Sequence, residues 1–66
     1  MIQNSTEFLH SFFFGNQIYS ADAIDRNVAA GVVDFCLENR MIEVPWNNGK
    51  RFYRILPEGE KVIGRR

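Results

Sequence analysis

The stretch IEVPWNNGKRFYRI, residues 42–55, decides the fold because alternating apolar and polar residues flank a central Asn48-Gly49 pair. Asn-Gly is the preferred pair for a two-residue type I′ turn, since both positions need a positive φ. A turn there fixes the facing pairs of an antiparallel hairpin as Asn47–Lys50, Trp46–Arg51, Pro45–Phe52, Val44–Tyr53, Glu43–Arg54 and Ile42–Ile55. One face then becomes apolar, and the other brings Glu43 opposite Arg54. The sequence therefore predicts a β-hairpin over residues 42–55.

A helix is expected near the start of the chain. Asn4 is followed three residues later by Glu7, a capping-box pattern that satisfies amides of the first helical turn. Apolar residues then recur four positions apart, and Gly15 is expected to end the helix in a left-handed conformation. Residues 12–14 are all Phe and sweep about 200° around a helix. Phe14 is therefore expected at an edge of the core or against a partner.

Two further helices and a short extended segment are expected before the hairpin. Residues 17–19 are expected to be extended, and Ser20 to cap a brief helix over residues 21–25. Asn27 is expected to cap a longer helix over residues 28–39. The face of that helix predicted to be buried carries Ala29, Val33, Cys36 and Leu37.

Charge is balanced in total but not along the chain. Residues 1–44 carry two Arg against six acidic residues, whereas residues 45–66 carry six basic residues against two Glu. A last helix is expected over residues 57–63, with Pro57 at its first position and Arg65-Arg66 beyond its negative end. This asymmetry suggests a face suited to an anion, while a solvated surface of mixed charge is the plainer interpretation.

Length and composition limit the classes of protein. The chain has 66 residues, so it is expected to form a single domain over residues 1–66. One Cys excludes an internal disulfide framework, and 45% hydrophobic residues exclude intrinsic disorder. No apolar run approaches the roughly 20 residues that span a bilayer, and the Met1-Ile2-Gln3-Asn4 start does not have the pattern of a signal peptide. A cytoplasmic location without membrane contact is therefore expected, and the small size suggests a phage or mobile-element product.

The order helix, strand, two helices, hairpin and helix resembles a winged helix-turn-helix domain. Residues 35–44, FCLENRMIEV, look like a recognition helix that runs into the first wing strand. Residues 51–60, RFYRILPEGE, resemble the RxYxLTPEGE ending of compact bacterial regulators of the MarR, PadR and ArsR kind. The resemblance implies an α+β fold with a three-helix core, a two- to three-stranded antiparallel wing and a short C-terminal helix. Two departures are Arg40, where the family often has Gly, and Leu56, where it has a capping Thr.

The resemblance implies binding of double-stranded DNA, for regulation of transcription or another DNA transaction, by a monomer or a homodimer. The wing would contact phosphates or the minor groove, and the start of the recognition helix would approach the major groove. The residues that carry this prediction are Arg26, Asn27, Asn47, Asn48, Lys50, Arg51 and Arg54.

The predicted recognition helix argues for a different partner. Its outward face is expected to carry Gly31, Asp34 and Glu38 flanked by Val28 and Phe35, and carboxylates repel phosphates. The alternative is therefore a winged-helix module or inhibitor that binds a protein. The apolar residues assigned to such an interface are Phe14, Phe35, Trp46 and Phe52.

Trp46 has three interpretations in the sequence. It stacks on Arg51 across the hairpin, it anchors a partner, or it closes the edge of the small core. Chemistry is not predicted. The chain has one His and one Cys, which cannot form a typical zinc site, and His10 and Cys36 lie on different predicted helices. No catalytic residue, metal, cofactor or small-molecule ligand is therefore assigned.

Overall fold

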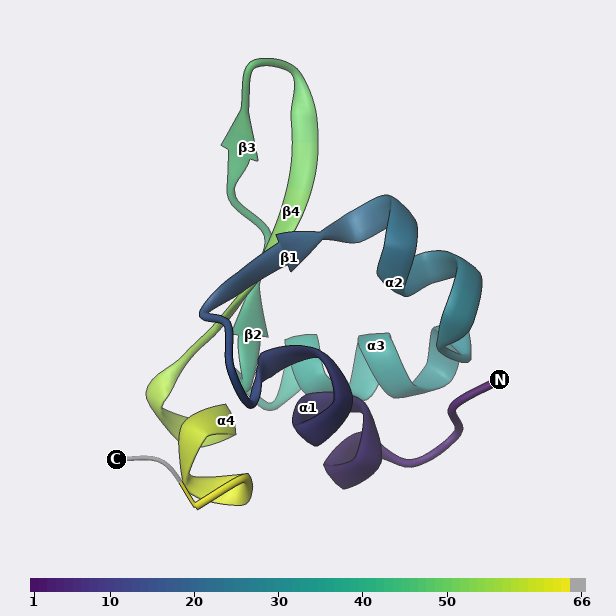
Figure 1. Cartoon of the computed structure of the whole chain (residues 1–66), viewed down its shortest axis with the longest axis vertical. Helices are drawn as coiled ribbons and strands as arrows, with labels where there is room; N and C mark the ends of the chain where they lie inside the picture. Colours follow the sequence, from purple (N-terminus) through teal and green to yellow (C-terminus); the bar gives the residue numbers. More distant parts are fainter. Residues whose placement is uncertain (65–66) are drawn as a thin grey trace.

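The computed structural model describes residues 1–64, which form a small α+β fold (Figure 1). Its elements are α1 (Ser5–Phe13), β1 (Ile18–Ser20), α2 (Ala21–Asn27), α3 (Ala30–Glu38), β2 (Ile42–Glu43), β3 (Trp46–Asn47), β4 (Lys50–Ile55) and α4 (Pro57–Val62). The Arg65-Arg66 pair that the sequence placed beyond the last helix lies outside the described residues.

The antiparallel sheet is built around β4. Strand β4 lies between β1 and β2, and its outer part pairs with β3 to form the arm that projects beyond the helices (Figure 1). Ile42 faces Ile55 and Trp46 faces Arg51, so the predicted register is confirmed. Asn48 and Gly49 have φ values of 55° and 78°, as a type I′ turn requires.

The ladder of the hairpin is interrupted between β2 and β3. Pro45 stands there and has no N–H to donate, although its carbonyl oxygen accepts from the Phe52 amide at 3.0 Å. The interruption divides the hairpin into a base that belongs to the main sheet and an arm that stands free of it. Strand β1, predicted as an extended segment, is shifted by one residue and joins the other edge of β4.

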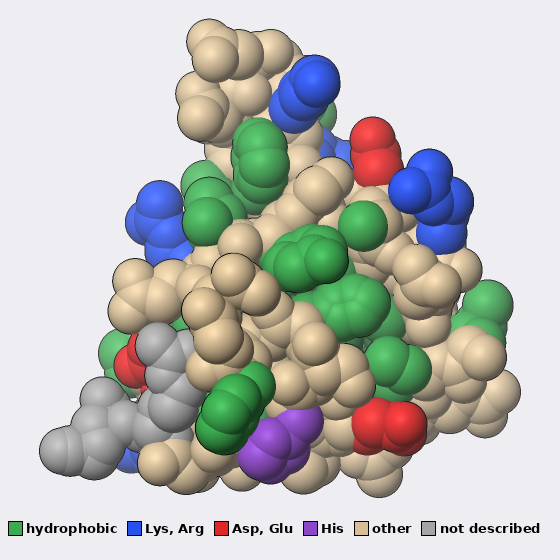
Figure 2. Space-filling model, viewed as in Figure 1, with side chains coloured by type: hydrophobic (Ala, Val, Ile, Leu, Met, Phe, Trp, Pro, Cys, Tyr) green, Lys and Arg blue, Asp and Glu red, His purple; other side chains and the backbone are tan. Residues whose placement is uncertain are grey.

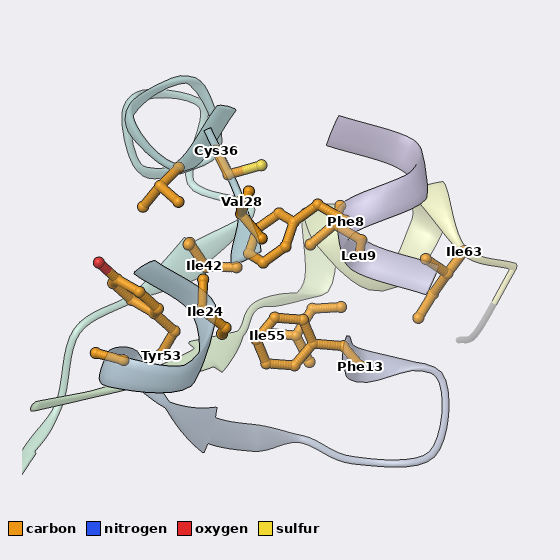
Figure 3. Packing of buried hydrophobic residues seen from close by; sticks show 12 residues of the cluster. Phe8, Leu9, Phe13, Ile24, Val28, Cys36, Ile42, Tyr53, Ile55 and Ile63 are labelled. Carbon is orange, nitrogen blue, oxygen red and sulfur yellow. The ribbon is translucent and has the colours of Figure 1, made fainter. Parts of the chain in front are cut away.

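The core lies between the three N-terminal helices and the inner face of the sheet (Figure 3). Helix α1 contributes Phe8, Leu9 and Phe13, and the Phe8 and Phe13 rings meet edge to face with centroids 5.8 Å apart. Helix α3 contributes Val33 and Cys36, as predicted. Every buried side chain in residues 1–64 is apolar except for that of Tyr53, whose hydroxyl has hydrogen-bond partners. Ile63, the residue that follows α4, covers one end of this core.

The predicted cap at Gly15 is wrong. Gly15 is not among the residues of positive φ, and α1 ends at Phe13 with Phe14 still in the right-handed helical region. The amide nitrogen of the Asn16 side chain donates to the Phe12 carbonyl oxygen at 3.3 Å. This side-chain bond satisfies an end carbonyl of the helix, so a left-handed residue is not needed. Asn4, by contrast, caps the start as predicted, since its Oδ1 accepts from the Glu7 amide at 3.0 Å.

The predicted cap at Asn27 is also wrong. Helix α2 continues to Asn27, whose Nδ2 donates to the Ala23 carbonyl oxygen at 2.8 Å, and α3 begins only at Ala30. Between them Val28 is extended and 2% exposed, whereas the sequence placed it on an outward face. The cause is a parallel bridge with Ile2, which donates to the Asn27 carbonyl oxygen at 2.9 Å and accepts from the Ala29 amide at 2.8 Å.

Candidate nucleic-acid interface

The tip of the arm gathers three of the residues predicted to bind DNA. Asn47, Asn48 and Lys50 are all exposed there, at the far end of the β3–β4 arm (Figure 1). The turn between them is fixed by the positive φ of Asn48 and Gly49, so the backbone positions that carry the two amide side chains and the ammonium group are fixed as well. Lys50 takes part in no ion pair within residues 1–64. The tip therefore presents hydrogen-bond donors and one free positive charge to solvent.

Arg51 is held by the protein itself. Its Nη2 lies 2.7 Å from Oδ2 of Asp25 on α2, and its Nη1 donates to the Tyr53 hydroxyl at 3.3 Å. The Tyr53 hydroxyl in turn donates to Asp25 Oδ1 at 3.1 Å. The hydrogen bond to Asp25 raises the pKa of Arg51, and burial raises the pKa of Tyr53. This triad ties the arm to α2, so Arg51 has a structural partner that the sequence did not indicate.

The predicted stack of Trp46 on Arg51 is wrong, because the Arg51 guanidinium contacts Asp25 and Tyr53 instead. The guanidinium carbon of Arg51 lies 6.0 Å from the centroid of the Tyr53 ring instead. Trp46 is 66% exposed, so it does not close the edge of the core either. Contact of Trp46 with a partner stays a prediction.

Arg54 makes the cross-strand pair that the hairpin register predicted. Its Nη1 lies 3.3 Å from Oε2 of Glu43, and both side chains are about half exposed. Exposed pairs of this kind are weak and exchange readily with other partners. Lys61 pairs with Glu58 on α4 in the same manner, at 3.4 Å. The charge asymmetry along the sequence is thus partly cancelled in space, because Arg51 and Arg54 meet acidic residues of the segment 1–44.

Arg26 and Asn27 do not join the tip of the arm. They line a shallow hollow together with Glu7 and Phe12 of α1 and the first two residues of the chain. Both are exposed, and Arg26 forms no ion pair within residues 1–64. Of the residues predicted to bind DNA, Asn47, Asn48 and Lys50 therefore share the tip, Arg51 and Arg54 lie farther along β4, and Arg26 and Asn27 lie on α2.

The outward face of α3 is acidic and partly apolar, as predicted. Asp34 and Glu38 are exposed, Phe35 between them is 48% exposed, and α3 contains no basic residue. Phe35 also forms one wall of an open groove of about 490 Å³. The other residues that line this groove are Gln3, Asn4, Ser5, Ala29, Gly31 and Val32. This surface disfavours a phosphate backbone and suits an apolar side chain.

The four residues assigned to a protein interface do not form one patch. Phe14, 64% exposed, lies at the end of α1 and stacks with His10 at a centroid distance of 6.1 Å. Phe35 lies on α3. Trp46 and Phe52 belong to the hairpin, but Trp46 faces Arg51 and thus lies on the opposite side of the ribbon from Phe52. Figure 2 shows hydrophobic side chains beside Lys and Arg side chains around the hairpin.

No cluster of three or more His, Cys, Asp or Glu side chains is placed to hold a metal ion within residues 1–64. Burial raises the pKa of the Cys36 thiol to about 11, so it is a poor nucleophile near neutral pH. None of the four helices has the length and apolarity that a membrane span requires. Comparison with protein-family models, curated proteins and solved structures finds no match to this chain.

Proposed function

We propose that the protein is a winged helix-turn-helix protein that binds DNA through the tip of its arm, in transcription or another DNA transaction. The sheet order β1-β4-β2, with two helices between β1 and β2, supports this description of the fold. The single observation that carries the function is the projecting tip. It offers two exposed amide side chains and the free charge of Lys50, at the end of an arm that projects beyond the helices.

The acidic face of α3 limits how such a protein would bind. A recognition helix in the major groove lies close to phosphates, and Asp34 and Glu38 would oppose this approach. Contacts from the arm would instead go to the DNA backbone or the minor groove. Such contacts position a protein without reading much sequence, so modest affinity and strong dependence on salt are expected.

Fluorescence anisotropy with a labelled 20-base-pair duplex tests the proposal. Binding is expected at 25 mM NaCl, with log affinity falling linearly against log salt. Lys50→Ala is expected to weaken binding and to reduce that slope by about one. Lys61→Ala is the matched control, because Lys61 is exposed on α4 and paired with Glu58. Absence of binding at 25 mM NaCl, or an equal effect of the two variants, would refute the proposal.

A second candidate, a protein-binding module, is favoured by Phe35. Its ring stands exposed between Asp34 and Glu38 beside the groove, an arrangement that fits an apolar side chain flanked by basic ones. A second copy of the chain is the simplest such partner. Sedimentation velocity at 10–200 µM is expected to show a dimer that Phe35→Ala abolishes. A monomer throughout this range would rule out the homodimer.

A further inference from the structure

The face of the sheet that points away from the core carries an aromatic ring between two basic side chains. Tyr53 and Ile55 are buried, so Lys50, Phe52 and Arg54 point to the opposite side, because side chains alternate along a strand. We call this side of β4, with its neighbours on β1, the outer sheet face. The register places Ser20 beside Phe52 and Ile18 beside Arg54, and Ile18 is 43% exposed.

These three side chains have a regular spacing. Residues two apart in a strand are separated by about 6.7 Å, so the Cα atoms of Lys50 and Arg54 lie roughly 13 Å apart with that of Phe52 midway. Lys50 has no ion pair within residues 1–64, and Arg54 has only the exposed contact to Glu43. Asn47, which faces Lys50 across the arm, adds an amide on the same side of the ribbon. Phe52 is half-buried, so its ring presents only part of its surface on this face, with a basic residue on either side.

This chemistry fits an unpaired nucleic-acid strand. Proteins bind single strands by stacking bases on exposed aromatic rings and holding the adjacent phosphates with Lys and Arg. A duplex cannot use the ring, since its bases are stacked on one another and present only their edges in the grooves. The acidic outer face of α3 also removes the usual contact of such folds with a duplex groove.

We infer that the outer sheet face binds single-stranded nucleic acid, with one base stacked on Phe52 and the flanking phosphates at Lys50 and Arg54. The inference rests on the proposed function in that both use Lys50. It differs in the ligand, because duplex DNA needs the tip of the arm and makes no use of Phe52. DNA and RNA strands share the chemistry involved, so the test includes both.

Anisotropy with labelled 12-mers of thymidine and of uridine, beside the 20-base-pair duplex, tests the inference. Phe52→Leu keeps an apolar side chain but removes the aromatic face, and it is expected to weaken binding of the single strands at least about fivefold. It should leave duplex binding within twofold. Phe52→Tyr should retain the affinity of the wild type. Phe14→Leu, an exposed Phe at the end of α1, is the matched control and should change nothing.

Glu43→Gln supplies an independent test of the inference. The substitution removes the negative charge opposite Arg54 and frees the guanidinium, so affinity for single strands is expected to rise by about two- to fivefold. A loss of affinity in this variant would contradict the inference. Should Phe52→Leu fail to fold, as judged by circular dichroism, Arg54→Gln takes its place and is expected to weaken single-strand binding.

The outcomes separate this inference from the proposed function. Binding of single strands that depends on Phe52, without duplex binding, would refute the proposed function and support the inference. Duplex binding with no affinity for single strands at 25 mM NaCl would overturn the inference alone. Equal affinities of Phe52→Leu and Phe14→Leu for single strands would overturn it as well.

Discussion

Replacing Gly59 by Ala tests how closely α4 packs on the sheet. Gly59 is buried, and a Cβ there would lie 2.8 Å from Cγ1 of Ile55 and nearer still to the Met41 carbonyl oxygen. That oxygen cannot retreat freely, because it accepts a hydrogen bond of 2.8 Å from the Leu56 amide. Overpacking of this kind costs about 1–3 kcal/mol, which exceeds the gain of up to about 1 kcal/mol in helix propensity. The net expectation is a loss of about 1–2 kcal/mol.

The same substitution at Gly31 is the control. Gly31 lies in α3, and a Cβ there would meet no atom within 4 Å, so only the helix propensity changes. Gly31→Ala is expected to raise the free energy of unfolding by about 0.5–1 kcal/mol. Urea unfolding followed by circular dichroism, with comparable m-values, measures both variants. If Gly59→Ala proves as stable as the wild type, or if both variants shift in the same direction, the argument from packing is wrong.

Three further substitutions address the cap, the buried thiol and the residue after α3. Asn4→Ala removes the side-chain cap on the Glu7 amide and should lower the free energy of unfolding by about 1 kcal/mol in urea titrations. The pKa of Cys36, raised from 9.0 to about 11, means that the folded state holds its proton more tightly. Stability contributed by this group is present below pH 9 and is lost as the pH rises towards 11. Between pH 8 and pH 10.5 the wild type should therefore lose about 2 kcal/mol more than Cys36→Ala, and parallel curves would contradict this. Arg40 has a φ of 58°, a region that favours glycine. Arg40→Gly should therefore raise the free energy of unfolding by up to about 1 kcal/mol and raise the melting temperature. A lower melting temperature would show that the backbone there is unstrained.

The parts of the fold that the sequence predicts are those set by neighbouring residues. Asn48-Gly49 specifies its turn by backbone preference alone, and the turn then dictates every facing pair along the hairpin. Asn4 caps α1 through an amide three residues away. Arg40 stands where the resembled family often has Gly, and its φ of 58° lies in the region that favours Gly.

The parts that the sequence does not predict depend on residues far apart. Asn27 is a good cap by type, but the start of α3 is decided by Ile2, which no local pattern connects to it. The same is true of Arg51, a plausible ligand for phosphate by type that is held by Asp25 on another element. Trp46 offered three interpretations because its burial depends on how far the arm projects. A pattern of residue types thus identifies candidates, and the tertiary contacts decide which of them remain available.

The bridge between Ile2 and Val28 joins the start of the chain to the segment between α2 and α3. Its two hydrogen bonds join position 2 to positions 27 and 29, so the chain from Ile2 to Val28, which contains α1, β1 and α2, forms a loop closed at both ends by backbone hydrogen bonds. Loss of these two hydrogen bonds would release the segment that joins α2 to α3 from the start of the chain. Amide exchange should accordingly report Ile2 and Ala29 opening as one unit, apart from β4. The start of α3 is thereby joined to a residue almost 30 positions earlier in the sequence.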